Sequence, residues 1–301
     1  MRLSTLFLLP ALAWATAASA QSLEVRDWQV VCDNTRACRA AGYSVDGSDM
    51  PASVLLARAS GPGMPVVGEL QLGALAGRAA LLKVFAAGGD ASFTAGKNTW
   101  RVSGSGAVEA LQQIDDVQGR AGRVSAIVRK GGGSDADVAS PMAVPRMDAT
   151  RLPAAAQPDD GALAVRVLAT IRSNADCPLL DDGAAQARAR LWHLDANRLL
   201  VTQPCQAGAN GARNGYWIAN LRPPYDAKPM TYSGLDYDGS ATIVAQRVTG
   251  AKGDCGAIEA WTWSGYRFEQ SFAATGGLCR GVKAGGAWQL PSVVSDVIAG
   301  N

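Results

Sequence analysis

Short apolar runs separated by glycine and proline fill the first part of the chain, between residues 23 and 128. Runs of this length, bounded by residues that break regular structure, are typical of β-strands. We therefore predict strands at Trp28–Val31, Ser53–Ala57, Val66–Leu72, Leu81–Phe85, Trp100–Val102 and Arg123–Val128.

One segment of this part has helical spacing instead. Its apolar residues recur every third or fourth position, which places them on one face of a helix. Ser105 precedes the segment as a possible N-cap and Gly119 follows it as a stop signal. The first part is thus predicted to be a sheet that carries one helix. The residues on the apolar face are Ala107, Ala110, Leu111, Ile114 and Val117.

Residues 131–161 differ in character, with a glycine run at the start and several prolines among alanine and aspartate. They hold too little bulky apolar surface to build a core. Proline favours extended polyproline geometry, so we predict an interdomain linker here. The predicted domains on either side are residues 21–130 and 162–301.

The second part begins with apolar residues at helical spacing after Asp159 and Asp160, so we predict a helix there. The remainder has strand character. Residues 191–199 align with residues 260–268, since both read as strand, tight turn, arginine and strand. The predicted fold class is mainly β with a few helices (α+β), in two antiparallel β-rich domains stapled by disulfides.

The first twenty residues have the pattern of a secretory signal. Arg2 is followed by an apolar run from Leu6 to Trp14 and then by small residues, with Ala18 and Ala20 in the A-x-A positions. The run is shorter than the roughly 20 residues that span a bilayer. We predict cleavage before Gln21, no membrane insertion afterwards, and a periplasmic location in a Gram-negative cell.

The chain has six cysteines, an even number that predicts a disulfide framework in an exported protein. Sequence neighbourhood favours three bridges, each closing a turn or hairpin. A zinc site is the rival interpretation, but no C-x-x-C pair is present and His193 is the only histidine. The predicted bridges are Cys32–Cys38, Cys177–Cys205 and Cys255–Cys279.

Charge gives no reason to expect a nucleic acid or an anionic lipid as partner. Loss of Arg2 with the signal lowers Lys+Arg from 28 to 27 against 26 Asp+Glu, so the net charge falls from +2 to +1. Tight non-specific binding to phosphate needs a strong basic patch. We therefore predict no nucleic-acid partner.

Five separated motifs are spread over nearly the whole mature chain, at residues 28–43, 53–58, 261–265, 279–281 and 288–291. Together they resemble domain-of-unknown-function family 1176. The opening half is also similar to the invasion-associated locus B family, through its Trp, Cys and Cys opening and the turn at residues 102–105. The resemblance implies an uncharacterised exported protein and supplies no catalytic residue.

Candidate catalytic groups have simpler structural explanations. His193 lies between Trp192 and Leu194 in an apparent strand, and no G-x-S-x-G elbow is present. The paired carboxylates are typical of helix starts and turns. Residues 236–240 resemble a calcium loop, but the positions that need glycine and glutamate hold Ala241 and Arg247. We predict no cofactor and no metal. The pairs are Asp115–Asp116, Asp159–Asp160 and Asp181–Asp182.

Tryptophans concentrate in the second part, and Trp261 and Trp263 are two residues apart, so in a strand they share a face. With Tyr266 and Trp192 they form a candidate ligand platform, unless they fill the core. We predict a non-enzymatic protein that binds a protein or an envelope glycan there. The alternatives are an envelope hydrolase using carboxylates or His193, and a structural or stress-related envelope factor.

Overall fold

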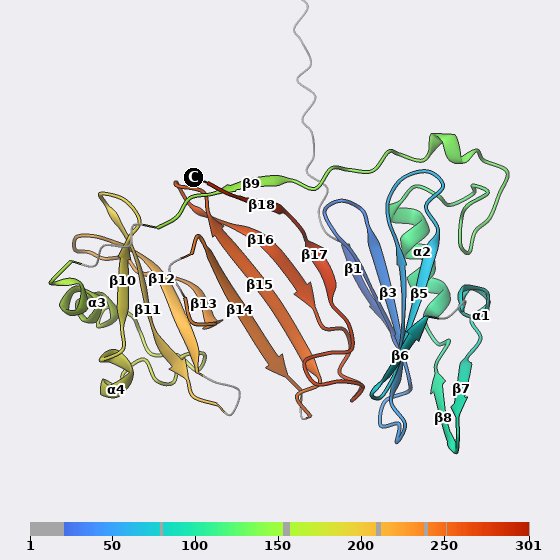
Figure 1. Cartoon of the computed structure of the whole chain (residues 1–301), viewed down its shortest axis with the longest axis horizontal. Coiled ribbons are helices and arrows are strands. Elements are labelled where there is room, and N and C mark those ends of the chain that lie inside the picture. The colour runs from blue at the N-terminus through green and yellow to red at the C-terminus, as the bar shows by residue number, and fades with distance from the viewer. Residues whose placement is uncertain are drawn as a thin grey trace, which may run out of the picture.

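The structure is a computed structural model and describes residues 21–78, 81–152, 157–208, 212–237, 240–250 and 252–300. In these ranges the chain is mainly antiparallel β, with two large sheets and three disulfides, which confirms the predicted fold class. The predicted signal, residues 1–20, lies outside the described residues. Figure 1 shows an elongated arrangement, with the first sheet at one end and the second sheet extending to the other.

The first sheet has six strands in sequence order, each antiparallel to the next. Its strands are β1 (Gln21–Val25), β2 (Trp28–Cys32), β3 (Cys38–Tyr43), β4 (Ala52–Arg58), β5 (Val66–Leu72) and β6 (Leu75–Arg78). Cys32 lies directly opposite Cys38 in the β2–β3 pair, and the predicted bridge joins them there. The strands predicted at Trp28–Val31, Ser53–Ala57 and Val66–Leu72 are confirmed.

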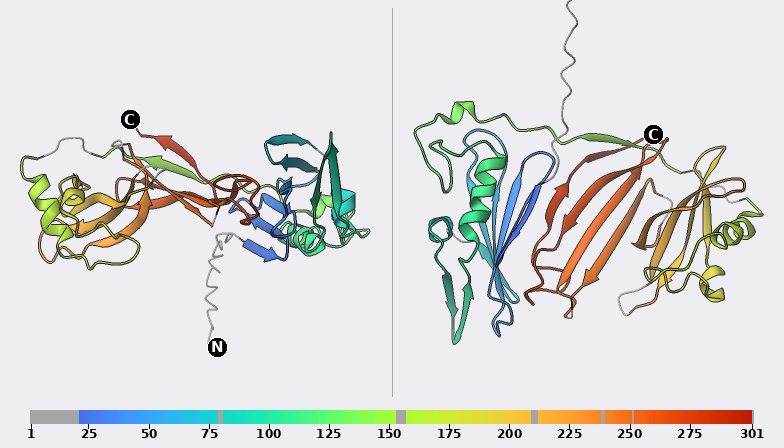
Figure 2. Two further views of the ribbon diagram at one scale, coloured as in Figure 1. Left: turned by 90° about the horizontal axis from the view of Figure 1, so that it is seen from below. Right: turned by 180° about the vertical axis from the view of Figure 1, so that it is seen from behind.

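Helix α2 (Ala107–Val117) covers one face of this sheet, as the view from behind shows (Figure 2). Its predicted apolar face packs with Trp28 and Val30 in one buried cluster. The N-cap is Gly106 and not Ser105, because the backbone there has a φ of 94°. A Cβ at Gly106 would also lie 2.2 Å from the Val25 carbonyl oxygen, so glycine is required.

The run predicted as a strand at Leu81–Phe85 is wrong. It forms helix α1 (Leu82–Ala86), whose Phe85 ring is buried with its centroid 4.9 Å from that of Trp28. A short apolar run does not distinguish a buried strand from a buried helical turn. The predicted strand at Trp100–Val102 is confirmed within the hairpin of β7 (Ala91–Ala95) and β8 (Asn98–Val102).

The predicted strand at Arg123–Val128 is also wrong, because a buried carboxylate binds its main chain. The Asp115 side chain accepts hydrogen bonds from the N–H groups of Ile127 (2.8 Å) and Val128 (3.0 Å). It also forms an ion pair with Arg58 at 3.8 Å, and both side chains are buried. These N–H groups are therefore not available for a strand ladder.

The second sheet has eight antiparallel strands in sequence order. They are β10 (Arg190–His193), β11 (Arg198–Gln206), β12 (Arg213–Asn220), β13 (Lys228–Gly234), β14 (Thr242–Thr249), β15 (Cys255–Trp263), β16 (Phe268–Thr275) and β17 (Leu290–Val293). The two predicted hairpins are β10–β11 and β15–β16, and the bridges Cys177–Cys205 and Cys255–Cys279 are confirmed. The predicted helix is α3 (Asp160–Leu168), which packs on the β10–β11 side of the sheet.

The segment predicted as a linker, residues 131–161, is paired with the end of the chain. It contains a short 3-10 helix (Asp135–Asp137) and strand β9 (Arg146–Ala149), which runs parallel to β18 (Asp296–Ala299). Thr150 N–H then donates to the Trp263 carbonyl at 2.8 Å. The domain boundaries predicted around this segment stay a prediction.

The C-terminal segment covers the face of the first sheet opposite α2. Leu278, Val282, Ala287 and Leu290 form one buried cluster with residues 31, 41, 43 and 55 of the first sheet. Polar contacts fix the same segment, since the Trp288 indole donates to Ser53 (2.6 Å) and Asn34 exchanges two hydrogen bonds with the Val294 main chain. Figure 1 shows β17 beside the first sheet.

Replacing Asp115 tests the role of its buried carboxylate. Asp115→Ala leaves Arg58 and two N–H groups without their partner, so we expect the free energy of unfolding to fall by about 3–5 kcal/mol. Asp116→Ala is the matched control, because its carboxylate pairs with the exposed Arg129 and its loss costs less than about 1 kcal/mol. Equilibrium urea unfolding with intact disulfides measures both, and equal effects would contradict this account.

Candidate functional site

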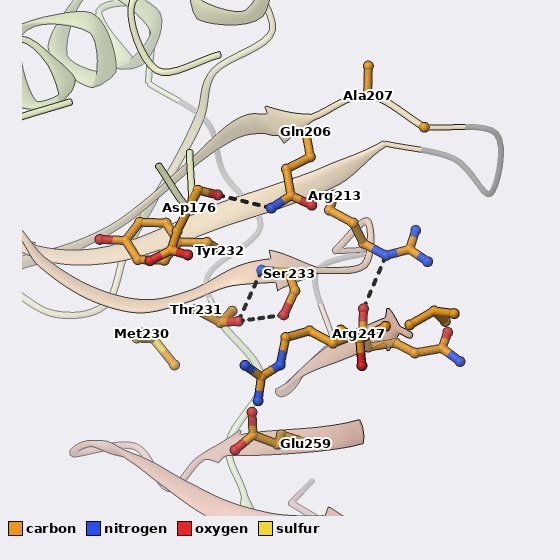
Figure 3. Close-up of a pocket in the computed structure, with 14 residues that line it drawn as sticks. Asp176, Gln206, Ala207, Arg213, Met230, Thr231, Tyr232, Ser233, Arg247 and Glu259 are labelled. Atoms are coloured by element: carbon orange, nitrogen blue, oxygen red, sulfur yellow. Dashed lines mark hydrogen bonds between the residues drawn. The ribbon is translucent and has the colours of Figure 1, made fainter. Parts of the chain in front are cut away.

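A cleft in the described chain lies where the second sheet opens between β13 and β14. These strands pair through Gly234 and Ala245 alone, whereas β14 pairs with β15 along its whole length. Residues 230–233 of β13 and 246–249 of β14 line the cleft, which has a volume of about 510 Å³. Figure 3 shows these side chains around it.

Two side chains form hydrogen bonds with the main-chain groups that would otherwise extend the β13–β14 ladder. The register at Gly234 and Ala245 puts Ser233 opposite Gln246. The Ser233 N–H instead donates to the Thr231 hydroxyl (3.2 Å), and the Gln246 carbonyl instead accepts from Nε of Arg213 (3.2 Å). Both bonds are drawn in Figure 3. The pairing therefore stops at this point, and the strands separate.

Tyr216 fixes the place where β13 and β14 still pair. Its hydroxyl donates to the Leu235 carbonyl at 2.7 Å, and the Leu235 N–H donates to the Val244 carbonyl at 2.8 Å. A Cβ at Gly234 would lie 2.2 Å from the Tyr216 ring, so this ring needs glycine beside it. Burial raises the pKa of Tyr216 to about 12, which keeps the hydroxyl protonated as a donor.

One of the three disulfides fixes the rim of the cleft. Cys177 and Cys205 are bridged, and the residues next to them in sequence, Asp176 and Gln206, line the cleft. The Gln206 amide donates to the Asp176 carbonyl at 3.1 Å across this rim. The bridge thus gives the cleft a fixed wall on this side.

Arg247 and Glu259 give the cleft its charges on the β14–β15 side. Figure 3 shows the Arg247 guanidinium turned toward the Glu259 carboxylate, yet these two described residues do not form an ion pair. Glu259 accepts a hydrogen bond from the Gln270 amide at 3.2 Å instead. Among the described residues, the Arg247 side chain has neither a hydrogen bond nor an ion pair, and it is exposed.

A second hollow of about 550 Å³ begins at the same two residues, Arg247 and Thr249. It runs to the seam with the first sheet, where Glu24 and Asp46 line it together with Arg280. The Cys255–Cys279 bridge lies in its wall. The two hollows together form a polar groove that crosses the end of β14.

The predicted aromatic platform is divided between core and surface. Trp263 is only 2 % exposed and packs in the core, so it is not part of an open platform. The Arg198 guanidinium lies 5.5 Å from the Trp263 ring centre and 5.4 Å from that of Tyr266. Tyr266 is 74 % exposed and Trp261 is half-buried. A ligand role for these two residues stays a prediction.

Trp192, the fourth platform residue, packs against the buried cluster that contains Trp263. It is half-buried and makes an edge contact with Tyr237, with ring centres 4.9 Å apart. The Arg190 guanidinium lies 5.4 Å from the Trp192 ring centre. The Trp192 ring is thus packed between neighbours, and a ligand role for it stays a prediction.

His193 is paired with a carboxylate of the predicted helix start. Its Nε2 lies 2.9 Å from Oδ1 of Asp160, whose other oxygen accepts from the Gln157 N–H at 2.7 Å. The helix starts at this pair as predicted, with Asp159 at the N-cap position, but the Asp159 side chain makes no capping hydrogen bond. Within the described chain, Asp160 is the only partner of the His193 side chain.

The other paired carboxylates have structural partners. Asp182 caps helix α4 (Gly183–Gln186) by accepting from the Ala185 N–H at 2.8 Å, and Asp181 bonds the Ser173 hydroxyl. Asp115 is buried under its main-chain bonds, and Asp116 pairs with Arg129. Part of the predicted calcium-like turn, Asp238 and Gly239, lies outside the described residues.

Two further findings concern the described part of the chain only. It contains no group of three or more His, Cys, Asp or Glu residues arranged to hold a metal ion. Every helix in it is too short or too polar to traverse a lipid bilayer. The three disulfides are typical of proteins that fold outside the reducing cytoplasm.

Comparison with known proteins yields one family. The family model described as "Protein of unknown function (DUF1176)" matches residues 22–80 and 76–295. No curated protein and no solved structure shows significant similarity to the chain. The similarity predicted for the opening half to the invasion-associated locus B family stays a prediction.

The contrast between Trp263 and Tyr266 is directly testable. Trp263→Ala removes a fully buried ring, so we expect the free energy of unfolding to fall by about 3–5 kcal/mol. Tyr266→Ala removes an exposed ring and should change it by less than about 1 kcal/mol. Chemical denaturation followed by circular dichroism measures both values. A small effect at Trp263 would show that the ring is not a core residue.

Proposed function

Because the chain belongs to the DUF1176 family of proteins of unknown function, its family assigns no activity, and we propose a function from the β13–β14 cleft. The protein is an exported, non-enzymatic binding protein. It takes an extended segment of a partner protein into this cleft, where the segment pairs with the main chain of β14. The observation that carries the proposal is the end of the ladder at Ser233 and Gln246.

Unpaired strand edges recruit other strands, because their N–H and C=O groups need partners. The carbonyls of Val244 and Gln246 point toward β13, since they accept from Leu235 N–H and Arg213 Nε. Alternation along a strand then turns the N–H and C=O of Val248 into the cleft. Val248 is 39 % exposed and lines the cleft. An inserted peptide finds its main-chain partner there.

The continuity of the groove favours an extended ligand over a compact one. The second hollow shares Arg247 and Thr249 with the cleft, so a chain that leaves the cleft continues along polar walls. Each hollow alone has the volume of an ordinary small-molecule site. A peptide strand uses both.

Two of the alternatives keep one supporting observation each. A glycan ligand is favoured by the exposed Tyr266, which belongs to the same hairpin as the half-buried Trp261. A hydrolase is favoured by the Asp160–His193 pair, in which a carboxylate orients an imidazole, although such a pair also stabilises the contact of α3 with β10. The third alternative, a structural or stress-related envelope factor, has no specific supporting observation in the described chain.

Export is part of the proposal and has its own test. We expect the protein produced in a Gram-negative host to be recovered from the periplasm with a mass that begins at Gln21. All six cysteines should resist alkylation before reduction, because they are bridged. Intact mass spectrometry measures both. A product that retains Met1 or has free thiols would overturn export as proposed.

The strand-insertion proposal is tested at Val248. Val248→Pro removes the N–H that faces the cleft, but no ladder bond to β15, because that N–H points away from β15. The probe is a displayed library of short linear peptides selected on the wild-type protein. We expect the selected peptides to lose binding to Val248→Pro at least tenfold and to keep their affinity for Val248→Ala, measured by calorimetry.

The contrary outcomes are equally defined. Peptides that bind Val248→Pro as tightly as wild type do not pair with β14, and failure to select any peptide also counts against the proposal. Binding of a glycan array that is lost on Trp261→Ala and Tyr266→Ala would instead support the aromatic site. Circular dichroism confirms that each variant is folded.

A further inference from the structure

Arg247 occupies the point where the two hollows meet, and it is available to a ligand. Three arginines line the groove, and the described chain gives partners to two of them. Arg213 donates to the Gln246 carbonyl, and Arg280 pairs with Asp27 (3.0 Å) and Asp46 (3.6 Å). Arg247 is exposed without a hydrogen bond or ion pair in the part that the structure describes.

We infer that the segment bound in the cleft carries an aspartate or glutamate side chain that pairs with Arg247. This inference rests on the proposed strand insertion and specifies its chemistry. A guanidinium offers planar paired donors that match a carboxylate, and a charge-assisted pair of this kind is stronger than a neutral hydrogen bond.

The strand geometry fixes where the acidic residue lies. Val248 turns its main chain into the cleft, so an inserted strand lies beside β14 and its side chains alternate between the two faces. Those on the same face as Arg247 become its cross-strand neighbours, with Cβ atoms about 5 Å apart. One position of the ligand therefore faces Arg247, and the residues on either side of it point to the opposite face.

Glu259 acts as the internal competitor for this pair. It lies on the same face of the sheet as Arg247, because Ala245 is opposite Glu259 and Ala257 is opposite Arg247. Its carboxylate is held by Gln270, and Figure 3 shows it on the side toward which Arg247 extends. It lowers the cost of leaving Arg247 without a ligand, and it repels an incoming carboxylate. Its neutralisation should therefore favour an acidic ligand.

The experiment compares two peptide libraries of the same length on the full chain. One library contains Asp and Glu, and in the other Asn and Gln replace them. We expect binders from the first library to carry an acidic residue at one fixed position, and replacement of that residue by its amide to weaken binding about tenfold. Arg247→Gln should weaken the acidic peptides by a similar factor and leave their amide versions unchanged.

Two variants complete the design. Glu259→Gln keeps the acceptor for Gln270 and should tighten the binding of acidic peptides a few fold. Arg222→Gln is the charge control, since Arg222 is exposed and lines neither hollow, and it should have no effect. If Arg222→Gln weakened the binding of acidic peptides as much as Arg247→Gln, the loss of affinity would be due to net charge alone. That result would overturn the inference.

Failure of the inference is distinguishable from failure of the proposed function. If Val248→Pro abolishes binding while Arg247→Gln does not, the strand inserts but its acidic residue is not recognised. If Val248→Pro has no effect, strand insertion itself is wrong, and the inference falls with it. Equal selection from both libraries would also overturn the acidic specificity.

Discussion

Main-chain hydrogen bonding is the constraint on which this molecule depends, because every N–H and C=O of a strand needs a partner once it leaves water. Along the second sheet the ladders meet this need up to Gly234 and Ala245. At the next step Thr231 and Arg213 supply the partners, and the sheet divides without leaving those groups unbound. At the cleft, hydrogen bonds from side chains thus replace the ladder bonds between the strands. The open cleft is stable because these main-chain groups keep their partners.

The sequence made the disulfides and hairpins predictable, because both are local. Cys32 and Cys38 face each other across one turn, and β15–β16 is a single hairpin. The failures at Leu81–Phe85 and Arg123–Val128 have another origin. Phe85 is fixed by a distant Trp28, and the second run by the carboxylate of Asp115. Contacts with distant residues determine the conformation of both segments, and the pattern within either segment does not reveal those contacts.

The candidate site shows the same limit more strongly. Spacing predicts that Trp261 and Trp263 share one face of a strand, but it gives no information on what covers that face. Arg198, from the other hairpin, lies over both Trp263 and Tyr266, yet only the Trp263 ring is buried. The sequence does not predict the cleft, because the cleft arises where the pairing of β13 with β14 ends. The available signals were the hydroxyl residues within β13 and the arginine at the start of β12, and each is common in ordinary edge strands.

The packing of the C-terminal segment on the first sheet has a consequence for the order of folding. Leu278 and Leu290 cover apolar residues that belong to the start of the chain, and β18 pairs with β9 from the middle of the chain. As the polypeptide emerges from its amino end, the first sheet acquires α2 early but keeps its other face bare until the last residues arrive. During that interval the apolar face of the first sheet is exposed and prone to aggregation. Its own C-terminal segment, or a chaperone bound in place of that segment, would cover it.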